Sequence, residues 1–208
     1  MAYRVVCISA TDGAAGEEIA PLVADRLGFR LVDEQIVARA AEEAGVERQV
    51  AAGVEQRRSL VSRVLAEIPA AGAASAAAYG AFAPIEDDVS DSSLRGLIRS
   101  AIEEIAGRGD AVIVSHAASL ALGEHPNALR VFLTASPDTR AARVLEMRDC
   151  SDKEAKKFVA RGDTNRADYL KRFYRVSSEQ PTHYDIVLNT DRLSAEQAAD
   201  LVVQAASA

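Results

Sequence analysis

Short apolar runs rich in β-branched residues alternate along this chain with longer segments in which apolar residues recur every three or four positions. The runs are predicted strands, at residues 3–9, 30–32, 111–115, 129–133 and 184–189. The longer segments are predicted helices, at residues 17–27, 94–107 and 136–148, from 151 onward and from 194 onward. Apolar strands that alternate with helices favour a parallel sheet covered on both faces, so the predicted fold class is α/β.

Residues that commonly begin or end helices stand at the borders of these segments. A glycine just after a helix suits its C-terminal cap, and Ser, Pro and Ser-x-x-Glu or Ser-x-x-Gln suit its start. They are Gly28 after the first helix, Ser136 and Pro137 before a later one, and the pairs Ser151/Glu154 and Ser194/Gln197.

The first strand runs through a small-residue loop, residues 10–16, directly into a helix. This order aims backbone N–H groups and the positive end of a helix dipole at an anion, as in loops that hold nucleotide phosphates. The full motif G-x-x-x-x-G-K-[ST] would begin at Ala10, but Ala10, Ala15, Gly16 and Glu17 occupy its four defined positions. We therefore expect poor triphosphate binding, and the alternative is a plain strand-to-helix connection.

Residues that directly follow strands are the candidate site residues, because ligands of parallel sheets bind at the carboxyl ends of the strands. Here they are residues 11–16, Asp33, Ser115, His116 and the region around Ala135. Asp33 has two interpretations that stay open: it caps the next helix, or it contacts an acceptor substrate beside the loop.

Composition narrows the function classes. The chain has 208 residues, about the size of one α/β domain, and 49% of them are hydrophobic. A formal charge of −7 argues against a general nucleic-acid or anionic-membrane binder. The two cysteines form neither a metal spacing nor a disulfide framework, which suggests a reducing compartment.

No leader or membrane span is expected from the sequence. The chain enters its first strand without a basic and then apolar signal stretch. The uncharged stretch at residues 68–84 is mostly alanine and too weakly apolar to cross a bilayer. We expect a cytoplasmic protein.

Two segments differ from the rest of the chain. Residues 66–84 hold ten alanines in nineteen positions and precede an acidic stretch, so residues 66–92 have helix propensity but little apolar area to bury. This segment is predicted either as an excursion that is mobile or depends on a partner, or as a loose surface insertion. Residues 140–175 hold eleven of the 24 Lys and Arg against six acids, which gives this segment +5 in a chain of −7. Basic outer helix faces explain most of the lysines. The arginines are candidates for anion contact, because guanidinium forks suit phosphate oxygens.

Three stretches of the second half resemble motifs of the cytidylate kinases, and especially of the cytidylate kinase-like branch of P-loop nucleoside monophosphate kinases. Residues 130–143 read RVFLTASPDTRAAR, residues 161–166 read RGDTNR, and residues 184–194 read YDIVLNTDRLS. The opening is similar as well, with its strand, Ser9, the small-residue loop, Glu18-Ile19 and then Asp33. The likeness covers nearly the whole chain except about residues 46–92.

The resemblance implies one P-loop kinase-like domain over residues 1–208, with a five-stranded parallel sheet and helices on both faces. Residues 46–92 would be the acceptor-side insertion, and residues 148–175 a lid-like basic helical segment. The implied reaction moves the γ-phosphoryl group of ATP to a cytidine or deoxycytidine monophosphate, with Mg²⁺ bridging the donor phosphates. Nucleotides would be the partners, and self-association stays open.

The resemblance also assigns roles to residues, none of them as metal ligands. Arginines of two helices would hold transferring phosphates, the loop would cradle the donor, and an Asp and Arg of the D-[ST]-N-R stretch would contact the acceptor's sugar and phosphate. The phosphate-holding set is Arg140, Arg143 and Arg166; the donor set is Asp12, Gly13, Ala14, Ala15 and Gly16; the acceptor residues that the resemblance gives are Asp163 and Arg166. Position and charge add Asp33, Arg161 and His116 to the acceptor set, and for His116 two interpretations stay open: it replaces a lost arginine, or it is a neutral structural histidine.

The chain departs from the branch at its donor end. This chain has Ser9-Ala10 where the branch usually has Ser-Arg, and residues 13–16 where the branch has Gly-Ser-Gly-Gly. It has Ser115-His116 where the branch usually has Gly-Arg. Loss of transition-state cations commonly costs orders of magnitude in rate. Two functions therefore remain: a kinase of weak or narrowed activity, or a catalytically degraded nucleotide sensor or assembly partner. A nucleic-acid binder built on residues 140–175 is a distant third, since few aromatics are interleaved there.

Overall fold

The computed structural model describes residues 2–33, 91–114 and 118–208, with only the backbone for residues 91–95 and 97. The predicted insertion at 46–92 lies outside the described residues except for its last two, and so does His116. Among the residues that are described, no helix has both the length and the apolar character needed to cross a membrane.

Five parallel strands form the central sheet, in the order β2-β3-β1-β4-β5. The strands are β1 Val5–Ala10, β2 Arg30–Val32, β3 Ala111–Val114, β4 Ala128–Thr134 and β5 Ile186–Asn189. The first strand is central: Val6 lies beside Val112 of β3 and Leu129 of β4. The α/β class and the five-stranded parallel sheet predicted from the sequence are confirmed.

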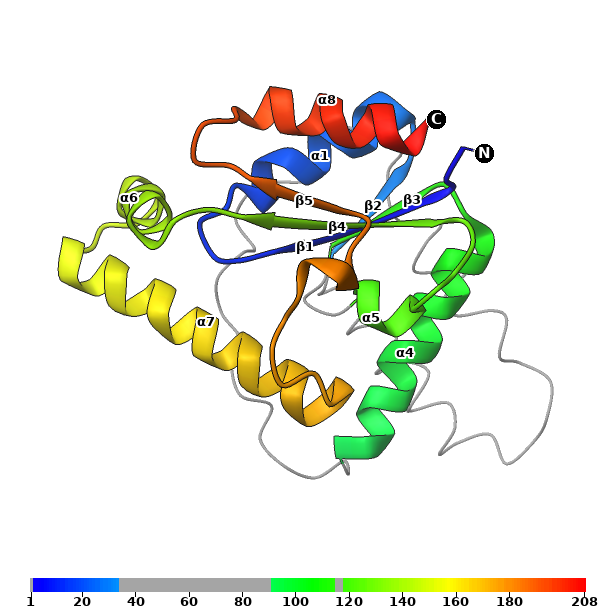
Figure 1. Cartoon of the computed structure of the whole chain (residues 1–208), viewed down its shortest axis with the longest axis horizontal. Helices are drawn as coiled ribbons and strands as arrows, with labels where there is room; N and C mark the ends of the chain where they lie inside the picture. Colours follow the sequence, from blue (N-terminus) through cyan, green and yellow to red (C-terminus); the bar gives the residue numbers. More distant parts are fainter. Residues whose placement is uncertain (1, 34–90, 115–117) are drawn as a thin grey trace.

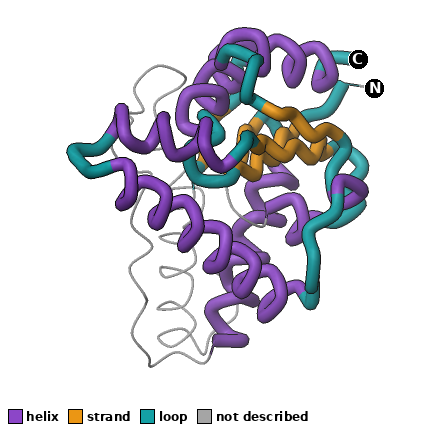
Figure 2. The backbone as a smooth tube through the Cα atoms, turned by 60° about the vertical axis from the view of Figure 1, so that its left-hand side comes forward, coloured by secondary structure: helices purple, strands orange, loops and turns teal. Residues whose placement is uncertain are grey.

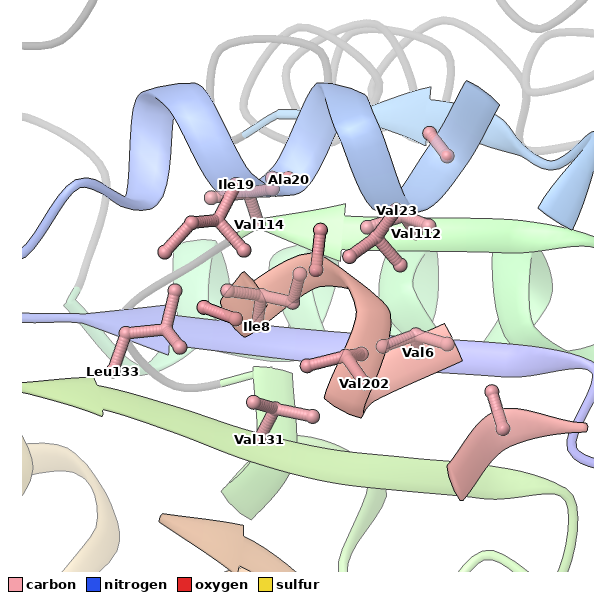
Figure 3. Close-up of a cluster of buried hydrophobic side chains, with 14 of the residues drawn as sticks. Val6, Ile8, Ile19, Ala20, Val23, Val112, Val114, Val131, Leu133 and Val202 are labelled. Atoms are coloured by element: carbon pink, nitrogen blue, oxygen red, sulfur yellow. The ribbon is translucent and has the colours of Figure 1, made fainter. Parts of the chain in front are cut away.

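Helices cover both faces of the sheet (Figures 1 and 2). One face carries α1 Gly16–Leu27 and α8 Ala195–Ala206, and the other carries α4 Asp91–Arg108 and α5 Ala118–Leu122. The core is made of apolar strand residues that alternate between the two layers, as the sequence pattern predicts. On the α1 and α8 face it includes Val6, Ile8, Val131 and Leu133 of the strands with Ile19, Val23 and Val202 of the helices (Figure 3).

Two further helices leave the carboxyl end of the sheet. They are α6 Pro137–Met147 and α7 Asp152–Tyr174, which lie side by side and share a small apolar cluster of their own (Figures 1 and 2). A single-turn helix, η1 Pro181–His183, then leads into β5. The predicted basic segment at 148–175 is thus largely one helix of 23 residues.

The predicted helix signals are confirmed by the local geometry. Gly28 adopts φ 66° after α1, and the Ser136 hydroxyl accepts a bond from the Thr139 N–H with Pro137 as first residue. The capping boxes that open α7 and α8 are both formed. Two strands start later than predicted because earlier backbone groups have other partners: the Tyr3 N–H donates to Ala206, and the Tyr184 N–H to Pro181.

Candidate active site

The loop between β1 and α1 is tightly packed, and its two glycines have steric reasons. Gly13 has φ 77°, and a Cβ there would lie 2.6 Å from the Arg140 carbonyl oxygen in the first turn of α6. A Cβ on Gly16 would lie 2.7 Å from the Cβ of Ala10. Ala15 also has a left-handed backbone, with φ 62°. The loop therefore fits against α6 only with its present backbone.

The loop carbonyls face away from the start of α1. Arg143 donates to the Gly13 carbonyl at 3.1 Å, and the Thr190 hydroxyl donates to the Ala14 carbonyl at 3.2 Å. Because the C=O and N–H of a trans peptide point in opposite directions, the Ala15 N–H faces the other side. Within the described part of the chain, the Ala15 and Gly16 N–H groups have no acceptor, and α1 has no side-chain cap. Such a helix start is suited to an anion.

Two carboxylates adjoin this anion position. Burial raises the pKa of Asp12, and the charge of Asp163 raises it further. Burial likewise raises the pKa of Glu17, although a hydrogen bond from its own backbone N–H lowers it in part. Both shifts mean that burial makes a negative charge on these two carboxylates costly, whereas poor triphosphate binding by the loop stays a prediction.

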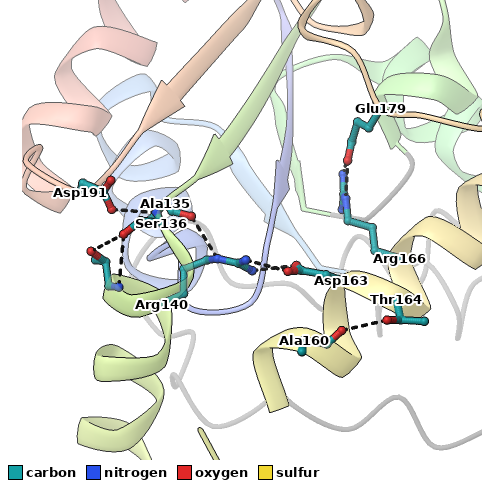
Figure 4. A network of polar contacts seen from close by, with 10 residues as sticks. Ala135, Ser136, Arg140, Ala160, Asp163, Thr164, Arg166, Glu179 and Asp191 are labelled. Carbon is teal, nitrogen blue, oxygen red and sulfur yellow. Dashed lines mark hydrogen bonds and ion pairs between the residues drawn. The ribbon is translucent and has the colours of Figure 1, made fainter. Parts of the chain in front are cut away.

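Arg140 and Asp163 form a bidentate pair between α6 and α7 (Figure 4). The two bonds measure 2.8 and 2.7 Å, and the Arg140 Nε also donates to the Ala135 carbonyl at 3.1 Å. The Arg140 side chain is only 5% exposed, whereas Asp163 is half-buried. Arg143 lies one turn along α6 but points elsewhere, to Gly13 and to the Thr190 hydroxyl and carbonyl.

Arg166 of α7 is held in a second buried network (Figure 4). Its Nε and Nη2 donate to the two carboxylate oxygens of Glu179 at 2.9 and 2.6 Å. Tyr184 donates its hydroxyl hydrogen to Glu179 and accepts a bond from Arg166 at 3.2 Å. The guanidinium also lies 5.1 Å from the ring centroid of Phe132, which stacks on Tyr184. Burial raises the pKa of the Tyr184 hydroxyl, and its bond to Glu179 raises it further.

A cavity of about 220 Å³ connects the end of β1 with α7 and the segment after it. Thr11, Asp163, Arg166 and Glu179 line it together with apolar residues such as Leu170. The Thr11 Oγ1 is buried and has no hydrogen-bond partner among the described residues. A buried hydroxyl without a partner is rare in native proteins, so this wall of the cavity is suited to a polar ligand group.

Most of the site residues expected from the sequence come together at this edge. The loop residues 12–16, Arg140, Arg143, Asp163 and Arg166 are all neighbours here. Arg161 is exposed on α7 and forms no ion pair within the described residues. Asp33 directly follows β2 at the carboxyl edge of the sheet, so both of its interpretations stay predictions.

Three polar residues of this site were missed in the sequence. Thr190 directly follows β5, so the rule that selected the other residues at strand ends also applies to it. Glu179 and Tyr184 lie in the connection from α7 to β5. Tyr184 opens the motif at 184–194 without being marked there as a site residue, and nothing in the local pattern marks Glu179. A carboxylate 13 residues beyond an arginine becomes its partner only because the chain turns back after α7.

A parallel α/β sheet with a glycine turn and an uncapped helix after its first strand, faced by helix arginines, defines the class of P-loop kinase-like folds. Residues 5–192 match the model of the cytidylate kinase-like family, and the chain belongs to that family.

The chain is also similar to two curated proteins named cytidylate kinase. It is 31% identical to that of Natronomonas pharaonis and 27% identical to that of Halobacterium salinarum, each over 123 residues. The matched region is 59% of this chain and spans 62% of the length of each relative. An uncharacterized protein from Eubacterium ventriosum has the same fold, with a TM-score of 0.68 and 16% identity over 97% of both chains.

Proposed function

We propose that this protein transfers the γ-phosphoryl group of ATP to a cytidine or deoxycytidine monophosphate. The observation that carries the proposal is the arrangement at the carboxyl edge of the sheet. An uncapped helix start, whose first N–H groups lack an acceptor among the described residues, lies there with the Arg140–Asp163 pair and with a cavity lined by Thr11, Asp163 and Arg166. Phosphoryl transfer needs this combination, since its catalysis is mainly positioning and charge neutralisation.

On the donor side, the N–H groups of Ala15 and Gly16 would hold phosphate oxygens of ATP. The Ala14 carbonyl, in the same peptide as the Ala15 N–H, accepts from Thr190, and the Ala15 carbonyl, in the same peptide as the Gly16 N–H, accepts from the Ile19 N–H. Because both peptides are fixed in this way, the N–H groups need no rearrangement to accept an anion. Magnesium would be held chiefly by the donor phosphates, with Asp12 as a carboxylate on that side. Among the described residues, no group of three His, Cys, Asp or Glu could hold a metal by itself. The ion, when bound, supplies neutralisation of the transferring charge.

On the acceptor side, Asp163 and Arg166 would contact the sugar and the phosphate, as the family resemblance implies. In the transfer, an oxygen of the acceptor's phosphate forms a bond to the γ-phosphorus while the bond to the bridging oxygen of ADP breaks. Arg140 would neutralise charge on the group that moves, and Arg143, which bonds to the Gly13 carbonyl on the other side of the loop, would hold the loop in position. The domain division of residues 1–208, with an acceptor-side insertion and a lid-like α7, is part of the same proposal.

Calorimetric titration with ATP–Mg²⁺, with CMP and with dCMP, followed by a coupled kinase assay, tests the proposal. We expect binding of a monophosphate and measurable ADP formation. Arg143→Ala should lower kcat about 100-fold or more, whereas Lys157→Ala, an exposed charge on the same pair of helices, should leave kcat unchanged. Urea unfolding of both variants separates lost chemistry from lost fold. Absence of nucleotide binding in the native protein would refute the proposal.

A second candidate is a catalytically degraded nucleotide sensor or assembly partner. The observation in its favour is that the arginines of the site already have internal partners, while Glu17 adds a carboxylate at the start of α1. The same experiment separates the two functions: micromolar binding of a nucleotide with no ADP formation above background would select the second.

A further inference from the structure

We propose that Glu179 sets the affinity and selectivity of this site for the acceptor's phosphate, because its carboxylate occupies the face of Arg166 that a phosphate would use. The inference rests on the proposed function and deepens it. It makes Glu179 an internal competitor that has to leave Arg166 when a phosphorylated ligand binds, and that remains in place when the ligand carries no phosphate.

The geometry of the pair is that of a bound anion. Two parallel bonds join the Nε and Nη2 of Arg166 to the two oxygens of Glu179, at 2.9 and 2.6 Å. Arginine binds phosphate through the same fork, with two oxygens in place of the two carboxylate oxygens. Both groups line the cavity that also contains Thr11 and Asp163. A phosphate in that cavity would therefore meet an arginine whose Nε–Nη2 edge is already occupied by a carboxylate.

The pair is buried enough for the competition to matter. Arg166 is 6% and Glu179 is 19% exposed, so solvent screens their attraction less than that of a surface pair. Tyr184 strengthens the hold on Glu179 by donating its hydroxyl hydrogen to the carboxylate. Burial by itself would raise the pKa of Glu179, but the bonds and charge of Arg166, with the Tyr184 hydroxyl, lower it overall. Glu179 is thus ionised and paired at neutral pH.

Exchange of the partner remains feasible for a phosphate monoester. Its charge at neutral pH is close to −2, against −1 for the carboxylate, so Arg166 gains attraction when the phosphate replaces Glu179. Glu179 lies on a short connection after α7 rather than in a helix or strand, which lets it move without unfolding either element. The apparent affinity for the phosphate is lowered by the fraction of molecules in which Glu179 still holds Arg166.

The test compares CMP, cytidine and inorganic phosphate binding to the native protein and to Glu179→Gln by calorimetry. We expect Glu179→Gln to tighten CMP and phosphate tenfold or more and to leave cytidine unchanged. Asp185→Asn is the matched control, because it removes one charge from another arginine–carboxylate pair, Arg130 with Asp185, outside the cavity. It should change none of the three affinities.

A second variant covers the case in which Glu179→Gln folds poorly. Tyr184→Phe keeps the stacking on Phe132 and the charge of Glu179 but removes the hydroxyl that holds the carboxylate. We expect it to tighten CMP severalfold. Unchanged or weaker CMP binding in both variants, with the native protein binding CMP, would overturn the role of Glu179 and leave the proposed function standing. Absence of CMP binding in all proteins would overturn both.

Discussion

The two sides of the candidate site are held by different forces. The donor loop between β1 and α1 is fixed by close backbone packing, with Gly13 against Arg140 and Gly16 against Ala10. Arg140 of α6 and Arg166 of α7 are fixed by ion pairs to carboxylates of the same chain. A packed backbone has no alternative arrangement of similar energy, whereas an ion pair can exchange one anion for another. In the proposed reaction, the donor side would therefore be preorganised and the acceptor side would be exchangeable.

This difference explains how the chain keeps a kinase fold with an altered phosphate loop. The loop depends on main-chain conformation, which survives when Ala15, Gly16 and Glu17 replace the usual side chains. The arginine side depends on side-chain charge, and there the charges are kept. Substitutions in the loop should therefore change the stability of the fold. Substitutions at the arginines should change the affinity for anions.

The largest effect is expected from Arg166→Ala, which leaves the buried carboxylate of Glu179 without its partner. Breaking a buried pair on one side typically costs about 3–5 kcal/mol in the free energy of unfolding. Urea unfolding should show this loss for Arg166→Ala, and part of it should be recovered in the double variant with Glu179→Ala, because no unpaired charge then remains. Equal stability of the single and double variants would contradict a coupled pair.

Next comes Gly13→Ala, which probes the packed side. Both Gly13→Ala and its control, Gly28→Ala, place an alanine at positive φ, at a cost of about 1–2 kcal/mol. Gly28 has open space where the methyl would go, whereas at Gly13 the methyl meets the backbone of Arg140. Overpacking adds about 1–3 kcal/mol at Gly13 alone. The free energies of unfolding of the two variants should differ by that amount. Coincident unfolding curves would show that α6 shifts to accommodate the methyl group at little cost.

Restoring the loop sharpens the comparison from the functional side. The variant Ala10→Gly, Ala15→Gly, Gly16→Lys and Glu17→Ser is sterically consistent, because removing the Ala10 methyl makes room for a side chain at position 16. Glycine at position 15 also relieves a left-handed alanine. We expect ATP–Mg²⁺ to bind about tenfold tighter, or about 1.4 kcal/mol, in calorimetry. Unchanged affinity would mean that this loop is not a donor site.

The local features of the fold could be predicted because they depend on neighbours in sequence. The periods of α1 and α8, the cap at Ser136 and the capping boxes at Ser151 and Ser194 follow from residues within one turn of each other. The α5 and η1 helices were missed because three to five residues carry too little periodicity.

The partners of the site arginines could not be predicted because they depend on how distant elements meet. Arg140 and Arg143 do share α6 at a spacing that suggests a common face, yet one turns to Asp163 and the other to Thr190. The reason for Gly13 likewise lies 127 positions away, in the first turn of α6. Residue type thus indicated arginines suited to anions, and their contact with phosphate stays a prediction, while their partners within the chain required the tertiary structure.

The smallest expected effect is that of Gly162→Ala, which tests whether α7 contacts the loop between β1 and α1. Gly162 of α7 lies against the Asp12 carboxylate, and a methyl there would overlap it. In an open helix, Gly→Ala stabilises by about 0.5–1 kcal/mol, and Gly96→Ala in α4, where the space is open, should do so. Gly162→Ala should gain nothing, because Asp12 is pushed from its place. In an Asp12→Ala background, Gly162→Ala should raise the free energy of unfolding by the full amount, about 0.5–1 kcal/mol, as measured by urea unfolding. An equal gain in stability with and without Asp12 would show that α7 and the loop are independent.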